Sequence, residues 1–122
     1  MFKVIIIGGD GFDNYPLFEE RCIACLKKKA KEGCGIMIYT TGEECNDKFA
    51  ARFSIDIRYY LTDWKKHGNN ALKIRNEEML KDADAIICFE DDTKDTKIFL
   101  KQAVEYGKKC RYIDKTGAAK VY

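Results

Sequence analysis

The stretch Val4-Ile5-Ile6-Ile7-Gly8-Gly9, close to the amino terminus, decides the fold. Four successive aliphatic residues followed by two glycines are typical of a strand that is buried on both faces and ends in a tight loop. Residues 85–89 form a second apolar run of this kind. Strands buried on both faces belong to parallel sheets covered by helices, so both runs predict central strands of an α/β protein.

Helical and strand patterns alternate around these two runs. The expected strands lie at residues 4–7, 35–39, 55–61, 85–89 and 111–113, and the expected helices begin after Asn14, at 43–53, around Arg75 and at 96–106. Alternation with short links predicts a three-layer Rossmann-like fold. We expect a five-stranded, mainly parallel sheet in the order 3-2-1-4-5, with residues 55–61 at one edge because polar and apolar residues alternate there.

The strand order also predicts where a ligand binds. In such sheets the site lies at the carboxyl ends of the two strands between which the chain reverses direction, here the first and the fourth. Residues 8–15 and 90–96 form the loops at that place. Residues 40–47 and the helix around Arg75 are expected to close the pocket.

Composition excludes several classes of protein. The chain of 122 residues suffices for one domain, 1–122, with a single core. Its 22 basic and 20 acidic residues give a net charge of +2, which is too balanced to indicate nucleic-acid binding. The basic residues at 27–31 are expected at the carboxyl end of a helix, where positive charge is favourable. The longest apolar run is far shorter than the roughly 20 residues of a membrane span. We therefore expect a cytoplasmic protein without a signal peptide and without nucleic-acid or membrane partners.

The six cysteines form no recognisable metal or disulfide pattern. Cys22 and Cys25 make the only C-x-x-C pair, and they lie in the middle of an expected helix, distant in sequence from the single histidine. Buried thiols in a reducing compartment are the favoured interpretation for most of them. Cys45 is set apart because it lies in a loop expected to border the pocket.

Residues 63–79, D-W-K-K-H-G-N-N-A-L-K-I-R-N-E-E-M, contain the only tryptophan and the only histidine. If Leu72 and Met79 belong to a buried helical stripe, the spacing places Asn76 on that face and Arg75 at its edge. An amide that faces inward needs a hydrogen-bond partner. A cation and an amide in this arrangement suit a pocket for a small polar ligand, so we expect both side chains to point into the cleft.

This segment resembles the motif D-W-x-x-x-G-x-x-A-x-x-I-R-N-x-x-M of the YspA, or cpYpsA-related, SLOG family. The chain is similar to the motif at Asp63, Trp64, Gly68, Ala71, Ile74, Arg75, Asn76 and Met79. The opening strand with Gly8, residues 41–47 and residues 83–114 are also similar to the corresponding parts of the family. The resemblance implies a Rossmann-like domain that binds a nucleotide or a nucleotide-derived small molecule.

The resemblance also implies which residues bind the ligand. Family members cradle phosphate with glycine loops at helix N-termini, where backbone N–H groups and the helix dipole face the anion. Here the first loop keeps its glycines, whereas the second carries Glu43, Glu44 and Cys45 in place of small residues and the last has no glycine. The implied binding residues are Gly8, Gly9, Thr41, Gly42, Asp47, Trp64, Arg75, Asn76, Asp91, Thr96 and Lys97.

The loops expected at the pocket are rich in acidic residues. These are Asp10, Asp13, Glu43, Glu44, Asp91, Asp92 and Asp95. Like charges oppose the binding of a bare phosphate, which leaves three alternatives. A divalent cation such as magnesium bridges carboxylates and phosphate, the ligand is less anionic than a nucleotide, or the site is inactive. Solvated acidic loops explain the pattern equally well.

Within the wider superfamily, the chain resembles the Lonely Guy phosphoribohydrolases, which have an arginine-containing helix followed by a glycine loop with paired glutamates. Arg75 matches the arginine, but Ile98 and Phe99 stand where the glutamates are expected. Glycosidic cleavage needs a carboxylate at that place. Glu77 and Glu78 are the candidates for that role if the chain is a hydrolase.

The sequence therefore predicts a sensor or regulatory domain that binds a nucleotide-like small molecule and requires no cofactor. A degenerate scaffold that acts as an interaction protein is the first alternative, and a nucleoside 5'-monophosphate phosphoribohydrolase is the second. Enzymatic activity is left open, with a binding role favoured. Tyrosines at 59, 60, 112 and 122 are compatible with a homo-oligomer.

Overall fold

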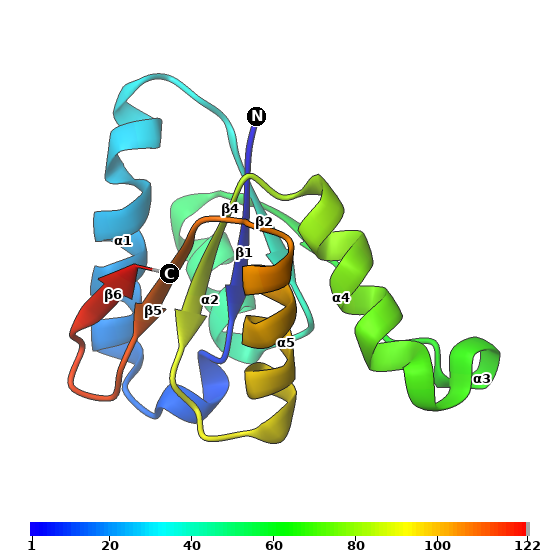
Figure 1. Ribbon diagram of the computed structural model, residues 1–122. Helices are drawn as coiled ribbons and strands as arrows, with labels where there is room; N and C mark the ends of the chain where they lie inside the picture. The colour runs from blue at the N-terminus through cyan, green and yellow to red at the C-terminus, as the bar shows by residue number, and fades with distance from the viewer. Residues whose placement is uncertain (122) are drawn as a thin grey trace.

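A six-stranded sheet with helices on both faces makes up the computed structural model (Figure 1), which describes residues 1–121; Tyr122 lies outside the described residues. The strands are β1 (Phe2–Ile7), β2 (Ile36–Thr40), β3 (Asp56–Tyr59), β4 (Ala85–Phe89), β5 (Cys110–Ile113) and β6 (Ala119–Val121). The helices are α1 (Tyr15–Lys31), α2 (Glu44–Phe53), α3 (Trp64–His67), α4 (Ala71–Asp82) and α5 (Lys94–Glu105). Two 3-10 turns, η1 (Asp10–Phe12) and η2 (Gly68–Asn70), join them.

The predicted fold class is confirmed. The strand order is β3-β2-β1-β4-β5-β6, with β1 and β4 parallel, adjacent and central, and β3 at one edge. The sheet has one strand more than expected, because β6 pairs with β5 in the antiparallel direction. The Asp114 carboxylate accepts the backbone N–H groups of Thr116 and Ala118, which fixes the turn between these two strands.

Two cores flank the sheet. On one face, the α1 residue Phe18 packs between Phe49 of α2 and Phe89 of β4, with ring centroids 6.1 Å and 4.7 Å away. On the other face, α4 and α5 bury Met79 and Phe99 against the sheet. Apolar side chains every three or four residues along each helix give it one inward face, and burial of these faces holds the three layers together.

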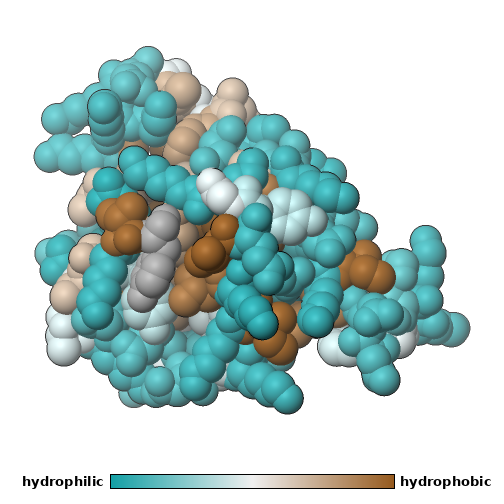
Figure 2. All heavy atoms as spheres, viewed as in Figure 1, coloured by the Kyte–Doolittle hydropathy of each residue, from teal (hydrophilic) through white to brown (hydrophobic). Residues whose placement is uncertain are grey.

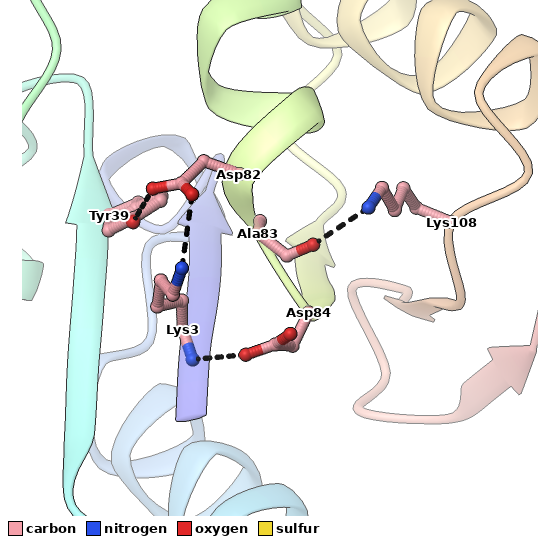
Figure 3. A network of polar contacts seen from close by, with 6 residues as sticks. All are labelled: Lys3, Tyr39, Asp82, Ala83, Asp84 and Lys108. Atoms are coloured by element: carbon pink, nitrogen blue, oxygen red, sulfur yellow. Dashed lines mark hydrogen bonds and ion pairs between the residues drawn. The ribbon is translucent and has the colours of Figure 1, made fainter. Parts of the chain in front are cut away.

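Polar contacts tie the two central strands together at their amino-terminal ends (Figure 3). The backbone N–H of Lys3 donates to the Asp84 carboxylate at 2.9 Å, and the Lys3 ammonium lies 3.0 Å from the Asp82 carboxylate. The Tyr39 hydroxyl from β2 donates to the other oxygen of Asp82. These contacts join the end of α4 to β1 and β2 and so position the strand that follows, β4.

The helix α3 projects from the body of the molecule beyond α4 (Figure 1). Trp64 opens it and is 57% exposed. The α3 segment is short, and α4 and η2 are its main neighbours in the fold. The segment with the strongest family resemblance is therefore divided between this projection and the packed helix α4.

Most of the face seen in Figure 2 is hydrophilic, with hydrophobic residues in small separate patches. Within residues 1–121, no helix is both long and apolar enough to cross a membrane.

The cysteines are unpaired, and four of them are buried: Cys22, Cys45, Cys88 and Cys110. This agrees with their interpretation as small hydrophobic residues. Cys25 is half-buried, and Cys34, in the turn between α1 and β2, is exposed.

Candidate functional site

A cavity of about 260 Å³ lies at the carboxyl ends of β1 and β4, where the chain reverses direction. We call it the switch-point cavity. It is lined by Ile7, Gly8, Asp10, Gly11, Thr41, Glu43, Arg75, Asp91, Thr93, Asp95 and Thr96. The lining comes from the loops after β1, β2 and β4 and from α4 and α5. This is the location that the doubly wound topology predicts for a ligand.

The two glycines after β1 are required for packing. Gly8 has a φ of +85°, and a Cβ there would overlap the carbonyl oxygen of Phe89 on the neighbouring strand. A Cβ on Gly9 would overlap the Cys45 sulfur and the Phe18 ring. Close approach of the loop to β4, α1 and α2 therefore explains both glycines without reference to a phosphate.

Asp10 occupies the backbone donors at the start of α2. Its two carboxylate oxygens accept the N–H groups of Glu44 and Cys45, each at 2.9 Å. Free N–H groups at a helix N-terminus are the donors that a bound anion usually engages. In this chain a carboxylate from the first loop already fills that position.

Asp91 organises the loop that leads into α5. One carboxylate oxygen accepts the backbone N–H and the hydroxyl of Thr93, both at 3.0 Å, and the other accepts the Thr96 hydroxyl at 2.8 Å. Thr93 in turn caps α5 by accepting the N–H of Thr96. The loop after β4 is thus ordered by its own carboxylate.

Arg75 is held in the wall of the switch-point cavity by a chain of hydrogen bonds. Its Nε and Nη2 donate to the Asn76 side-chain oxygen at 3.2 Å and 2.9 Å. The Asn76 amide donates to Gln102 of α5 at 2.9 Å, and Gln102 donates to the carbonyl of Lys73 at 3.2 Å. Burial lowers the pKa of Arg75, while the charges of Glu43 and Asp95 oppose this shift.

The prediction that Asn76 points into the cleft is wrong. Asn76 is fully buried and is absent from the cavity lining. Its inward amide is satisfied by Gln102, which is itself buried, so the pair forms a polar bridge between α4 and α5. Asn76 therefore positions Arg75.

Glu43 is the half-buried acid on the opposite side of the cavity. The Thr41 hydroxyl donates to one of its oxygens, and the amide of the fully buried Asn46 donates to the other at 3.1 Å. Burial raises the pKa of Glu43, and the nearby charge of Asp10 adds to the increase. An acid with a raised pKa facing an arginine with a lowered pKa is an arrangement that occurs often in binding and catalytic clefts.

Of the predicted binding residues, the cavity brings together Gly8, Thr41, Arg75, Asp91 and Thr96. The remaining ones lie elsewhere. Gly9 borders a neighbouring hollow with Asp13 and Glu44, and Asp47 accepts the Tyr59 hydroxyl on the far side of α2. Gly42 and Lys97 are exposed outside the lining, as is Trp64 on α3.

The carboxylates considered for hydrolysis are also outside the cavity. Glu77 and Glu78 lie on α4 beyond Arg75, and neither contributes to the lining. At the two positions where Lonely Guy enzymes carry glutamates, Phe99 is fully buried and Ile98 is half-buried.

Sequence reasoning missed several residues that build the site. Gln102 and Asn46 are buried amides that hold Arg75 and Glu43, and Thr93 and Gly11 line the cavity. The two amides could have been recognised from the sequence, because each is a polar residue on an otherwise apolar face of a helix. The partners of each lie on other elements, so the sequence pattern alone does not identify them.

Among the described residues, no group of three or more His, Cys, Asp and Glu side chains is arranged to hold a metal ion. No protein-family model matches the chain, and no curated protein or solved structure is significantly similar to it.

Proposed function

We propose that this chain is a SLOG-type binding domain that takes a nucleotide-derived small molecule in the switch-point cavity and acts as a sensor or regulator. The observation that carries the proposal is Arg75. It is a half-buried cation, fixed by Asn76, in a cavity at the carboxyl ends of the central strands. Within the described residues it forms no ion pair, so part of its guanidinium is free to bind an acceptor group of a ligand.

The charges around Arg75 support a ligand that is less anionic than a free nucleotide. Four carboxyl groups line the cavity, those of Asp10, Glu43, Asp91 and Asp95. Asp10 already accepts backbone N–H groups at the start of α2, and Asp91 already accepts hydrogen bonds from Thr93 and Thr96. A nucleoside offers hydroxyl and amino donors to carboxylates and carbonyl or ring-nitrogen acceptors to Arg75. A nucleotide would need a divalent cation, for which carboxylate oxygens are suitable ligands.

The size of the cavity favours a small ligand. Its volume of about 260 Å³ is below the roughly 300–1,000 Å³ that is usual for small-molecule pockets. A nucleoside or mononucleotide therefore suits the cavity better than a dinucleotide such as NAD.

A thermal-shift screen tests the proposal. Nucleosides, nucleotides, NAD and ADP-ribose are added to the purified protein with and without magnesium, and the melting temperature is measured. A ligand that binds only the native state at one hundred times its Kd contributes about 2.7 kcal/mol, which raises the melting temperature by several degrees. Failure of every compound to raise the melting temperature would contradict the proposal.

The variant Arg75→Ala locates the binding site. It should abolish the ligand-induced shift while the unliganded protein still melts cooperatively. Lys73→Ala is the matched control, because Lys73 is an exposed cation on the same helix whose side chain does not line the cavity. An unchanged shift in the Arg75 variant would remove this residue from the site.

A degenerate scaffold that acts through protein contacts is the second candidate. The observation in its favour is the occupation of the α2 N-terminus by Asp10, since its contacts with Glu44 and Cys45 remove the backbone donors that a phosphate would use. Phosphoribohydrolase activity is less well supported, because no carboxylate follows Thr96 at the expected positions. Incubation with AMP, GMP, CMP and UMP should release free base only at background rates, as measured by chromatography.

A further inference from the structure

A second cavity lies at the opposite end of the sheet from the switch-point cavity. It has a volume of about 390 Å³ and separates the carboxyl-terminal half of α1 from the starts of β1, β4 and β5. We call it the basic groove. Its lining includes the apolar Phe2, Cys25 and Ala85 and the basic Lys28, Lys109 and Arg111.

The floor of the basic groove is apolar. Val4 and Ile87 lie beneath it in the core between the sheet and α1, and the apolar surface that remains accessible comes from the half-buried Phe2, Cys25 and Ala85. Within the described residues no helix follows β5, because the chain turns directly into β6. The part of this face beside Arg111 is therefore left without the helix that would cover it in a longer doubly wound sheet.

The rim of the groove carries positive charge. Within the described residues, Lys28, Lys109 and Arg111 form no ion pair, whereas Lys29 is paired with Glu32. Asp84 is the groove's carboxylate, and it is engaged by the backbone N–H of Lys3 (Figure 3). The groove thus presents uncompensated cations above an apolar floor.

A further unsatisfied donor lies beside the groove. Arg21 precedes Cys25 by one turn of α1, on the same helix face, and its buried Nε has no hydrogen-bond partner within residues 1–121. The charges of Arg111 and Arg21 both act on the Cys25 thiol and partly offset the increase in its pKa caused by burial. Two guanidinium groups therefore approach the Cys25 wall of the groove.

We propose that the basic groove is a second binding site, specific for a small molecule with an apolar body and a carboxylate. The apolar body would lie against the half-buried Phe2, Cys25 and Ala85, and the carboxylate would accept hydrogen bonds from the planar Arg111 guanidinium, with Lys109 nearby. A volume of about 390 Å³ falls within the usual range of small-molecule pockets. The walls on both sides favour a compact ligand over an extended peptide.

A titration followed by amide NMR tests this proposal on the complete chain. The probes are butanoate, hexanoate and octanoate, with octanamide as the uncharged analogue and acetate as the carboxylate without an apolar body. Octanoate should shift the amide signals of residues 24–29, 85–87 and 109–111. Each buried methylene should tighten binding by about fourfold, so octanoate should bind about 250-fold more tightly than butanoate if its four additional methylenes are all buried, and about sixteenfold if two are.

Substitutions on the rim separate specific binding from general attraction to a basic surface. Arg111→Gln should weaken octanoate binding by about tenfold, the usual effect of losing one charged hydrogen bond. Lys109→Gln should weaken octanoate binding less. Because Lys109 lies in the turn before β5, this variant still tests the rim charges if the Arg111 variant, altered within the strand, does not fold. Lys27→Gln is the matched control, because Lys27 is on the same helix as Lys28 but borders a different hollow beside α2.

Several outcomes would overturn the proposal. These are unshifted groove amides at millimolar octanoate, equal binding of octanamide, or unchanged affinity in both rim variants. An acidic peptide that shifts the same amides where octanoate does not would assign the groove to a protein partner instead. None of these outcomes depends on whether the switch-point cavity binds a nucleoside.

Discussion

Asp10 determines what the loop after β1 is able to bind. Its carboxylate takes both free N–H groups at the start of α2, so an external anion would have to displace it. The same side chain contributes negative charge to the cavity and adds to the increase in the pKa of Glu43. One residue thus caps a helix and sets the electrostatic character of the site.

Removing this carboxylate should therefore change both stability and ligand preference. Asp10→Ala is expected to lower the free energy of unfolding by about 1 kcal/mol, as for the loss of a helix cap. It should also free the donors of Glu44 and Cys45, so that inorganic phosphate raises the melting temperature of the variant. Asp13→Asn, in the same loop, is the control. Equal stabilisation of the variant and the wild type by phosphate would show that Asp10 does not block the anion position.

Glu43 predicts a distinct dependence of stability on pH. Its pKa is raised in the folded state by burial, so the folded protein holds this proton more tightly than the unfolded chain. The contribution of Glu43 to stability is thus complete below its ordinary pKa of about 4.5 and declines as pH rises through the folded-state pKa.

Glu43→Gln should abolish this decline, because the amide has no proton to lose. It also preserves the contacts with Thr41 and Asn46, since the hydroxyl is able to accept as well as donate. Unfolding in urea at pH 4.5 to 8 measures the difference between the two proteins. Asp82, Asp92 and Asp114 have lowered pKa values and affect stability at lower pH. Parallel pH profiles for variant and wild type would contradict the assignment.

The turn that ends β1 depends on Gly8 for two separate reasons. Its φ of +85° strains any other residue, and a Cβ would collide with the backbone of β4. Gly33, after α1, shares only the first reason, because its φ is +76° and, apart from its two chain neighbours, no atom of the described residues lies within 4 Å of the position that a Cβ would take. Substitutions at the two glycines therefore distinguish the cost of conformational strain from the cost of a steric clash.

Gly8→Ala should cost about 2–4 kcal/mol of stability, the sum of strain and overpacking, whereas Gly33→Ala should cost about 1 kcal/mol. Chemical denaturation of both variants measures the comparison. Similar losses would show that the contact between the first loop and β4 relaxes without penalty.

Elements with a local cause were predictable from the sequence. The aliphatic runs identify β1 and β4, and Asn14 caps α1 through the N–H of Leu17, where the sequence places the helix start. Long-range contacts explain most of the differences. Asp10 meets the start of α2 across 34 residues, and Asn76 meets Gln102 across 26. The residues around Asp10 and Asn76 in the sequence do not indicate which distant groups these side chains contact.

The strand β6 was missed for a different reason. Ala119–Val121 contains three exposed residues, too few to show the alternation that identifies a strand. Its pairing with β5 is set by the turn at Asp114 and leaves it at the edge of the sheet. The prediction of an edge position for β3 succeeded because residues 55–61 are long enough to show such a pattern.

The order of the strands predicts how stability is distributed over the whole molecule. Amide hydrogens of β1 and β4 are covered by helices on both faces and paired on both sides, so they should exchange with solvent only on global unfolding. Those of β6 and of the projecting α3 should exchange much faster. Native-state hydrogen exchange measures this order. Protection of β6 equal to that of β1 would indicate an additional partner along that edge.

The exposed thiol of Cys34 lies in the turn between α1 and β2, at the amino-terminal end of the strands, whereas the switch-point cavity opens at their carboxyl ends. A maleimide linker should therefore react there first and anchor the protein to a sensor chip in one orientation, with the switch-point cavity facing the flow. Air oxidation at the same sulfur should join two copies back to back, so preparations kept without a reductant should contain covalent dimers with both cavities open.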